Sequence, residues 1–347
     1  MYRYIGNKER LLPVIMQTVG EMIGDGGVVA DIMAGTGLVS LELRKAGYKV
    51  IAADMMTYSK HHLNVHLLLN QAPPFNGVDS IPSNGANRYE DVLEYLNSLA
   101  PFKGYFYNEF SPDGTPQNGL PPRKYFTPLN ASKIDAIRVQ INDWLTEGRL
   151  TPVEESLLKH TLIMATNKVA NISGTYGYFL SKFTKSALEE ITLLPVEFEE
   201  SDNINHLIVQ GFAEDISSEI QADLCYIDPP YMKRQYAANY HILETIARGD
   251  YPEAIGKSGL RDWWDQHSKF CTKTQGLDSF DKVIGSMKCD NFIISYSEDG
   301  LFTLEQLVAA FEKHGTVSVD YIDFPRFRSN GSLLPKRLQE YVIRLTR

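Results

Sequence analysis

The segment 223–231 reads D-L-C-Y-I-D-P-P-Y, and its last four residues could hold an amino group. A buried strand that ends at two prolines must turn, because neither proline nitrogen can donate to a sheet and each proline fixes its own φ. The rigid turn would hold a carboxylate oxygen of Asp228 and the carbonyl oxygen of Pro229 a fixed distance apart, next to Pro230 and the ring of Tyr231. An amino group on a planar base could be clamped between these two acceptors. The alternative is a surface turn whose aspartate is merely solvated.

A second group of residues has the spacing of a nucleoside-binding site. Asp31, Gly35 and Gly37 form D-x-x-x-G-x-G after an apolar run, and Asp54 ends the next apolar run. Glycines let a backbone approach a ligand, and an acid at this distance takes ribose hydroxyls. The third glycine of a dinucleotide fingerprint is missing, and Asp31 would repel a pyrophosphate but could bind an amino group. The pattern favours a ligand without phosphates, such as S-adenosylmethionine.

Asp215 follows another predicted strand, residues 206–210, together with Phe212. A carboxylate in this place could accept the exocyclic amine of an adenine, and Phe212 could pack on the ring. His62 and His66 lie one helical turn apart and could form a metal pair. No third ligand lies close to them in sequence, so packing or solvation is the favoured interpretation, and no metal is expected.

A parallel sheet would bring these strand ends to one edge, where open α/β sheets bind ligands. We expect a Rossmann-like α/β sheet of the S-adenosylmethionine-dependent methyltransferase type, with an antiparallel edge from the closing strands 317–322 and 341–345. Residues 1–70 and 201–347 are predicted to form the catalytic domain. Residues 71–200, rich in turns and then helical, are predicted to be an inserted target-recognition region.

The composition is that of a soluble protein. The 347 residues are 43% hydrophobic, with a formal net charge of −9. No run of about 18 apolar residues and no apolar signal core occur, so we expect a cytoplasmic protein with no membrane partner. The three cysteines are far apart and favour neither a disulfide framework nor a zinc site.

The net charge conceals two basic segments. Residues 121–186 carry nine Lys and Arg against five acids, and residues 324–347 carry six against one glutamate. Local basic patches can bind a polyanion although the whole protein is acidic. The loop at 171–182 adds glycines, hydroxyls and tyrosines, as nucleic-acid-contacting loops often do. The alternatives are solvated faces and a plain tyrosine-rich turn. The candidate DNA-binding residues are Arg123, Lys124, Tyr176, Lys182, Arg234, Arg326, Arg328, Asn330, Lys336 and Arg337.

These motifs together resemble the N6-adenine DNA methyltransferases of the Dam-like class, and most closely the FokI-type enzymes of type IIS restriction-modification systems. The resemblance covers nearly the whole chain. It rests on an R-Y-I-G-x-K opening at residues 3–8, on D-x-x-x-G-T-G, and on D-P-P-Y followed by R-Q-Y at residues 234–236. The resemblance implies transfer of a methyl group from S-adenosylmethionine to a flipped adenine in double-stranded DNA, with Asp228 and the Pro229 carbonyl accepting the hydrogens of the amino group.

The resemblance also implies a role for each cofactor-site residue. Asp31 would lie at the methionine part of the cofactor, Asp54 at the ribose and Asp215 at the adenine amine, with Lys8 near the catalytic loop. Met33 stands where the family usually has phenylalanine. The remaining residues assigned to this site are Tyr4, Gly35, Thr36, Gly37, Met55 and Phe212.

Three matters stay open. The same D-P-P-Y chemistry occurs where amino groups of RNA bases or of proteins are methylated, although a basic inserted region favours duplex DNA. A non-catalytic DNA-recognition subunit is the other alternative. A companion restriction endonuclease or a second methyltransferase is a possible partner.

Overall fold

The computed structural model describes residues 8–83, 87–117, 119–200, 205–325, 335 and 337–347. Its contacts divide the chain into two compact units. The first, here called the sheet unit, comprises Asn7–Met55, Ser201–Gln235 and His267–Arg347. The second, here called the helical unit, contains Met56–Glu200 and Tyr236–Gln266. The two units are defined by their internal contacts and not by function, so the target-recognition role of residues 71–200 stays a prediction.

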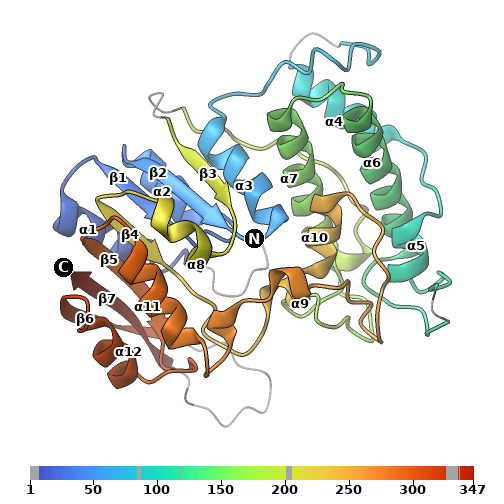
Figure 1. The fold of residues 1–347 in the computed structure, drawn as a ribbon. Helices are drawn as coiled ribbons and strands as arrows, with labels where there is room; N and C mark the ends of the chain where they lie inside the picture. Colours follow the sequence, from blue (N-terminus) through green and yellow to red (C-terminus); the bar gives the residue numbers. More distant parts are fainter. Residues whose placement is uncertain (1–7, 84–86, 118, 201–204, 326–334, 336) are drawn as a thin grey trace. The chain divides into compact units, whose positions relative to one another are not determined.

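The sheet unit is built on a seven-stranded sheet with the order β3-β2-β1-β4-β5-β7-β6 (Figure 1). Strands β1 to β5 are parallel, and β7 runs antiparallel to both of its neighbours, β5 and β6. The strands are β1 Val28–Asp31, β2 Lys49–Asp54, β3 Leu207–Gln210, β4 Leu224–Ile227, β5 Asn291–Ser297, β6 Thr316–Pro325 and β7 Arg337–Thr346. The predicted mixed Rossmann-like sheet, closed by an antiparallel hairpin, is confirmed.

The central strands are continuous apolar runs, as expected for strands whose two faces are both covered by helices. Phe280 and Phe311, from two of these helices, share one buried cluster with Cys225 and Phe292 of the strands. On the other face α1 packs against β4, β5 and α2. The helices of this unit are α1 Leu12–Ile23, α2 Leu38–Lys45, α8 Ala213–Ile216, α11 Gly276–Ser286 and α12 Leu304–Phe311.

The register of the central strands places the predicted site residues together. Asp31, the last residue of β1, pairs with Ala52 of β2 on one side and with Tyr226 of β4 on the other. Asp54 is the last residue of β2, and Asp228 directly follows β4. Three carboxylates on three adjacent parallel strands therefore reach the same edge of the sheet.

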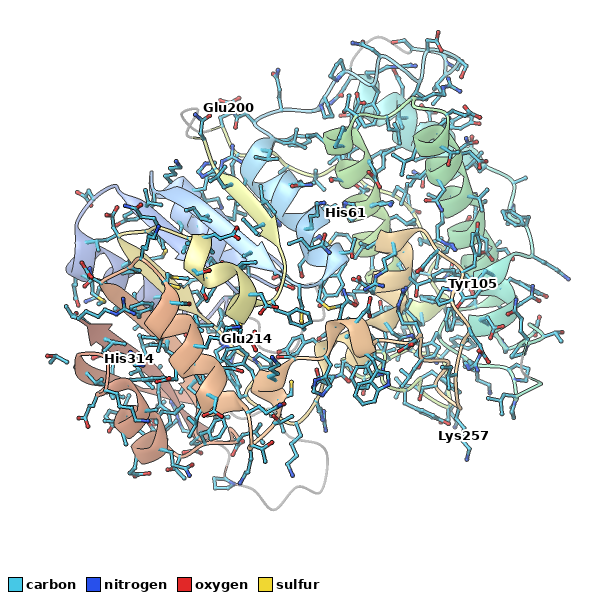
Figure 2. All side chains as sticks on the ribbon, in the orientation of Figure 1. His61, Tyr105, Glu200, Glu214, Lys257 and His314 are labelled. Atoms are coloured by element: carbon cyan, nitrogen blue, oxygen red, sulfur yellow. The ribbon has the colours of Figure 1, made fainter. Side chains whose placement is uncertain are left out.

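The helical unit is held by buried polar contacts as well as by apolar packing. Its helices are α3 Thr57–Leu68, α4 Arg88–Ser98, α5 Tyr105–Phe110, α6 Pro128–Thr146, α7 Pro152–Lys168, α9 Tyr236–Asn239 and α10 His241–Arg248. Thr151 and Glu154 form a capping box at the start of α7, which satisfies free amides of the first turn. His61 on α3 joins Ser156 of α7 to the carbonyl of Ala247 on α10 (Figure 2). None of the described helices has the length and apolarity needed to cross a membrane.

Arg123 is a structural residue of the helical unit, and its assignment to DNA binding was wrong. Its side chain is 0% exposed, and its guanidinium forms an ion pair of 2.7 Å with the buried Glu109. It also donates to the carbonyls of Ala254 and Gly256. A guanidinium that is enclosed and saturated in this way cannot contact phosphate without unfolding its surroundings.

Replacing Arg123 with alanine should destabilise the helical unit, because Glu109 would remain as a buried charge without its partner. We expect a loss of about 3–5 kcal/mol in the free energy of unfolding. All three tryptophans of the chain, Trp144, Trp263 and Trp264, belong to this unit, so their fluorescence during urea unfolding reports on it. The control is Lys168→Ala, which removes the exposed pair with Glu189 and should cost less than about 1 kcal/mol. An Arg123 variant as stable as this control would contradict the structural role.

Candidate functional site

The turn that follows β4 holds Asp228 in a network of short contacts. The ammonium of Lys8 lies 3.0 Å from Oδ1 of Asp228. The hydroxyl of Tyr231 donates to the same oxygen at 3.0 Å, and the Lys8 ammonium lies 4.5 Å from the centroid of the Tyr231 ring. Tyr231 is itself fixed, because its carbonyl accepts from Leu301 and its ring packs against Tyr296 at 5.4 Å. The turn was predicted from the sequence, the family resemblance implied that Lys8 lies near it, and the structure brings Lys8, Asp228 and Tyr231 into contact.

Two opposing effects act on the Asp228 carboxyl group. Burial raises its pKa above the ordinary value, and the neighbouring Lys8 ammonium lowers it. Removal of the carboxylate from water favours the protonated form, whereas an opposite charge in contact favours the ionised form. Lys8 therefore helps to keep Asp228 ionised, which is the state in which both oxygens accept hydrogen bonds.

Asp31 is the most deeply buried acid at this edge, with 1% exposure. Its Oδ2 accepts a hydrogen bond of 2.7 Å from Ser40 on α2. Its Oδ1 is buried and has no hydrogen-bond partner among the described residues. Burial is the main cause that raises the pKa of Asp31 to about 7, and the charges of Asp228 and Asp54 add to it. A buried carboxylate oxygen without a partner is costly, so this oxygen marks a place where a donor is expected.

The loop between β1 and α2 needs its two glycines. Gly35 has φ 55° and Gly37 has φ 78°, values in the left-handed region that favours glycine. The amide of Gly35 donates to Oδ2 of Asp54 at 2.9 Å, so the acid at the end of β2 holds the loop against the sheet edge. Thr36, between the glycines, is partly buried. The backbone of this loop is consequently presented at the same edge as Asp31.

Phe212, Met55 and Asp215, which were assigned to the cofactor site, lie near the ends of β2 and β3 and differ in exposure. Phe212 precedes α8 and is partly buried, as is Met55 after β2. Asp215 on α8 is 64% exposed and pairs with Lys282 of α11 at 3.2 Å. Its carboxylate is thus turned toward solvent and α11, because α8 begins immediately after Phe212 and rotates residue 215 outward. The assignment of Asp215 to the adenine amine of the cofactor stays a prediction.

Two further residues near β3 and β1 have structural contacts. Glu214, the buried acid of α8, accepts from Ser279 of α11 (Figure 2). Met33 packs against the apolar cluster beneath the sheet, which is a structural contact and leaves the backbone of the glycine loop unchanged.

The candidate DNA-binding residues fall into three groups. Tyr176 is fully buried, and its hydroxyl lies 3.5 Å from Asn167, so its assignment to DNA binding was wrong. Lys124 and Lys182 of the helical unit and Arg234 and Arg337 of the sheet unit are exposed. The remaining candidates, Arg326, Arg328, Asn330 and Lys336, lie outside the described residues, as does the cofactor candidate Tyr4.

The structure also identifies residues that the sequence analysis missed. Tyr178, two positions beyond Tyr176, is 54% exposed and stacks on Phe179 with ring centroids 4.6 Å apart. Ser40 orients Asp31, and no motif in the sequence marked it. Glu340 on β7 is buried and lies close enough to Lys8 and Asp228 for their charges to act on it. Its one sequence signal is that it is the single acid in the basic segment 324–347.

The histidine pair has a structural explanation. His62 donates to, or accepts from, His160 of α7 through their Nδ1 atoms at 2.8 Å. The ring of His66 packs edge-on against the same His160 at 5.4 Å. Burial lowers the pKa of both His62 and His160, so these two hydrogen-bonded imidazoles are neutral. Within the described part of the chain, no group of three or more potential ligands could hold a metal ion.

Comparison with known proteins identifies the class to which this fold and this site correspond. The family model of the D12 class N6 adenine-specific DNA methyltransferases matches residues 4–309. The chain belongs to this family.

Several curated relatives are similar over nearly the whole chain. The type II methyltransferase M.FokI of Planomicrobium okeanokoites is 33% identical over 98% of this chain and 52% of its own length. The modification methylase LlaI of Lactococcus lactis subsp. lactis is 33% identical over 98% of this chain and 54% of its own length. The type II methyltransferase M.NlaIII of Neisseria lactamica is 32% identical over 94% and 92%, respectively. The chain thus spans about half the length of the first two relatives and nearly all of the third.

Replacing Lys8 with methionine should raise the pKa of Asp228, because burial would remain and the compensating positive charge would be lost. The pKa can be followed by NMR titration of protein with labelled aspartate carboxyl carbons. The matched control is Lys282→Met, which breaks the exposed pair with Asp215 and should leave Asp228 unchanged. An Asp228 titration that is identical in the Lys8 variant and the wild type would contradict the ion pair.

Proposed function

We propose that this protein methylates the N6 amino group of adenine in double-stranded DNA, with S-adenosylmethionine as the methyl donor. One observation carries the proposal: the D-P-P-Y turn and the unpartnered oxygen of Asp31 lie on adjacent parallel strands of the same sheet edge. Membership in the adenine-specific methyltransferase family supports this assignment.

The residues at the sheet edge fit the proposed cofactor. Oδ1 of Asp31, buried without a partner among the described residues, is proposed to accept from the ammonium of the methionine part. The left-handed glycine loop, with Gly35 and Gly37, lets the backbone approach the ligand. Asp54, at the end of β2, is the acid for the ribose hydroxyls. Thr36, Met55 and Phe212 complete this site. When bound, S-adenosylmethionine supplies a methyl group on a positively charged sulfur.

The chain's own residues make the amino group reactive. The N6 nitrogen of adenine is a poor nucleophile because its lone pair is delocalised into the ring. If Asp228 and the carbonyl of Pro229 accept hydrogen bonds from its two N–H groups, the nitrogen becomes more tetrahedral and its lone pair can form the new N–C bond as the S–C bond of the donor breaks. The donor would leave as a neutral thioether, and the methylated nitrogen would release one N–H proton to water. Pro230 keeps this turn rigid. Positioning and electrostatic stabilisation of the positive charge that develops on nitrogen provide the rate enhancement.

The target base must leave the helix to reach this turn. A stacked adenine does not expose its amino group to an enclosed carboxylate, so the nucleotide is flipped out at a cost of a few kcal/mol. The ring of Tyr231, fixed beside Asp228, provides a face on which the flipped base stacks.

Exposed basic residues in both units supply DNA contacts. Lys124 and Lys182 belong to the helical unit and Arg234 and Arg337 to the sheet unit. Arg234 follows the catalytic turn by three residues. Phosphate contacts of this kind position the protein on the duplex without specifying sequence. Arg326 and Arg328, which lie outside the described residues, are proposed to make further DNA contacts.

The likeness to restriction-modification methyltransferases supports a role as the modification enzyme of such a system, in the cytoplasm and with a companion endonuclease or second methyltransferase. The competing function is methylation of an amino group in RNA or protein. Mass spectrometry of nucleosides from methylated DNA separates these functions, because N6-methyldeoxyadenosine is the expected product.

Replacing Asp228 with asparagine should lower methyl transfer by about 100- to 1,000-fold, because the negative charge that stabilises the positive charge developing on the amino nitrogen is lost. Transfer of tritiated methyl groups to DNA measures the rate, and calorimetry should show cofactor binding retained. The matched control is Asp223→Asn, at the opposite end of the same strand, where Asp223 accepts from the amide of Val28. Turnover of the Asp228 variant at the wild-type rate would overturn the proposed function.

Cofactor affinity should depend on pH through Asp31. Its pKa of about 7 in the free protein means that a proton must leave before the carboxylate can pair with an ammonium. Affinity should therefore weaken as the pH falls below 7, by roughly tenfold between pH 7.5 and pH 6. Calorimetric titration with S-adenosylhomocysteine, which carries the same amino acid group, measures this. Asp31→Asn should bind weakly with no such slope, and an unchanged slope in this variant would contradict the role of Asp31.

Removing the two exposed lysines of the helical unit should weaken DNA binding at low salt. Lys124→Ala together with Lys182→Ala should reduce the slope of log affinity against log salt by about two, if each neutralises one phosphate. The control is Lys313→Ala, which removes an exposed lysine just after α12. An unchanged salt slope in the double variant would identify this patch as ordinary surface.

A further inference from the structure

Glu340 is a buried acid whose carboxylate is only half satisfied. It lies on β7, where it pairs with Ser297 of β5 and Ile322 of β6. The side chain is 8% exposed and accepts a hydrogen bond from the Ser297 hydroxyl. Its Oε2 is buried and has no partner in the part of the chain that the structure describes. Neither the sequence motifs nor the proposed mechanism uses this residue.

The charges that face Glu340 connect it with the catalytic turn. The positive charge of Lys8 lowers the pKa of Glu340, and the negative charges of Asp228 and Asp299 raise it. β7 is the second strand from β4, with β5 between them. Burial raises the pKa of Glu340 to about 7, and the Lys8 charge lowers it. Lys8 therefore has two carboxylates in its surroundings, Asp228 in direct contact and Glu340 beyond contact distance.

The proposed reaction conflicts with the observed position of Lys8. During methyl transfer the positive charge of the donor moves to the target nitrogen, which is held by Asp228. An ammonium 3.0 Å from the same carboxylate would repel this charge and would weaken Asp228 as an acceptor. Lys8 is thus suited to hold Asp228 ionised before the substrate arrives, and unsuited to remain there afterwards.

We propose that Glu340 is a second ion-pair partner for the Lys8 ammonium. Lys8 pairs with Asp228 in the empty site and with Glu340 when the target amino group is bound to Asp228. This inference rests on the proposed function. The open Oε2 of Glu340 supplies the acceptor that Lys8 needs after it leaves Asp228, so no ammonium is left buried without a partner. Glu340 acts through Lys8 and is a positioning residue.

The first test uses structure and needs no activity. A crystal structure of the Asp228→Asn variant removes the charge that holds Lys8 in its first position. We expect the Lys8 ammonium about 3 Å from Oε2 of Glu340. If the ammonium remains on residue 228, or turns to solvent while Oε2 of Glu340 stays unpaired, the inference is overturned.

The second test is a double-mutant cycle on the methyl-transfer step. Glu340→Gln keeps the size of the side chain and an acceptor for Ser297 but removes the charge that attracts Lys8. The single-turnover rate at saturating DNA and cofactor should fall by about tenfold or more in the wild-type background. In the Lys8→Met background the same substitution should change the rate by less than about twofold, because there is no ammonium to reposition.

A purely structural role for Glu340 predicts a different pattern, with the same fold loss in both backgrounds. That result, or a Glu340→Gln rate within about twofold of the wild type, contradicts the inference. The control is Asp320→Asn on β6. This substitution removes a carboxylate that pairs with Arg344, a residue of β7 like Glu340, and should leave the rate unchanged. A wild-type protein that transfers no methyl group would refute the proposed function, and the structure of the Asp228→Asn variant would still decide the position of Lys8.

Discussion

The burial of Asp31 beside two further carboxylates is the constraint on which this site depends. Asp31, Asp54 and Asp228 lie at the ends of adjacent strands, and the charges of the other two raise the pKa of Asp31. Lys8 compensates for one of these acids in the empty site. The edge is thus prepared for ligands that bring positive charge, namely an ammonium, a sulfonium and an amine that becomes positive as it is methylated. A neutral or anionic ligand would leave the repulsion in place.

Most of the fold followed from local patterns. The apolar runs of β1, β4 and β5 predicted buried parallel strands, and their carboxyl ends were expected to meet because parallel strands share one edge. The D-P-P-Y turn and the glycine loop were recognisable from the sequence because proline fixes its own φ, and because a left-handed backbone conformation favours glycine. The residues predicted there, Asp31, Asp54 and Asp228, do come together.

Features that depend on the direction of a side chain could not be predicted. Arg123 and Tyr176 belong to a basic or tyrosine-rich stretch, but tertiary packing buries both. Asp215 lies on the short helix α8 and pairs with Lys282 of α11, a contact that its position after a predicted strand did not reveal. Ser40 contacts Asp31 from the helix that follows the glycine loop, and Glu340 reaches the site from a strand far away in sequence. Their contribution depends on register between α2 and β1, or between β5 and β7, which composition and spacing do not encode.

The account is tested most directly by a crystal structure of the protein with S-adenosylhomocysteine bound. We predict that the amino nitrogen of the ligand lies within hydrogen-bonding distance of Oδ1 of Asp31, the buried oxygen that has no partner among the described residues. Asp54 should lie at the ribose and the sulfur should point toward the D-P-P-Y turn. A ligand bound elsewhere, with Oδ1 of Asp31 still unpaired, would contradict the account.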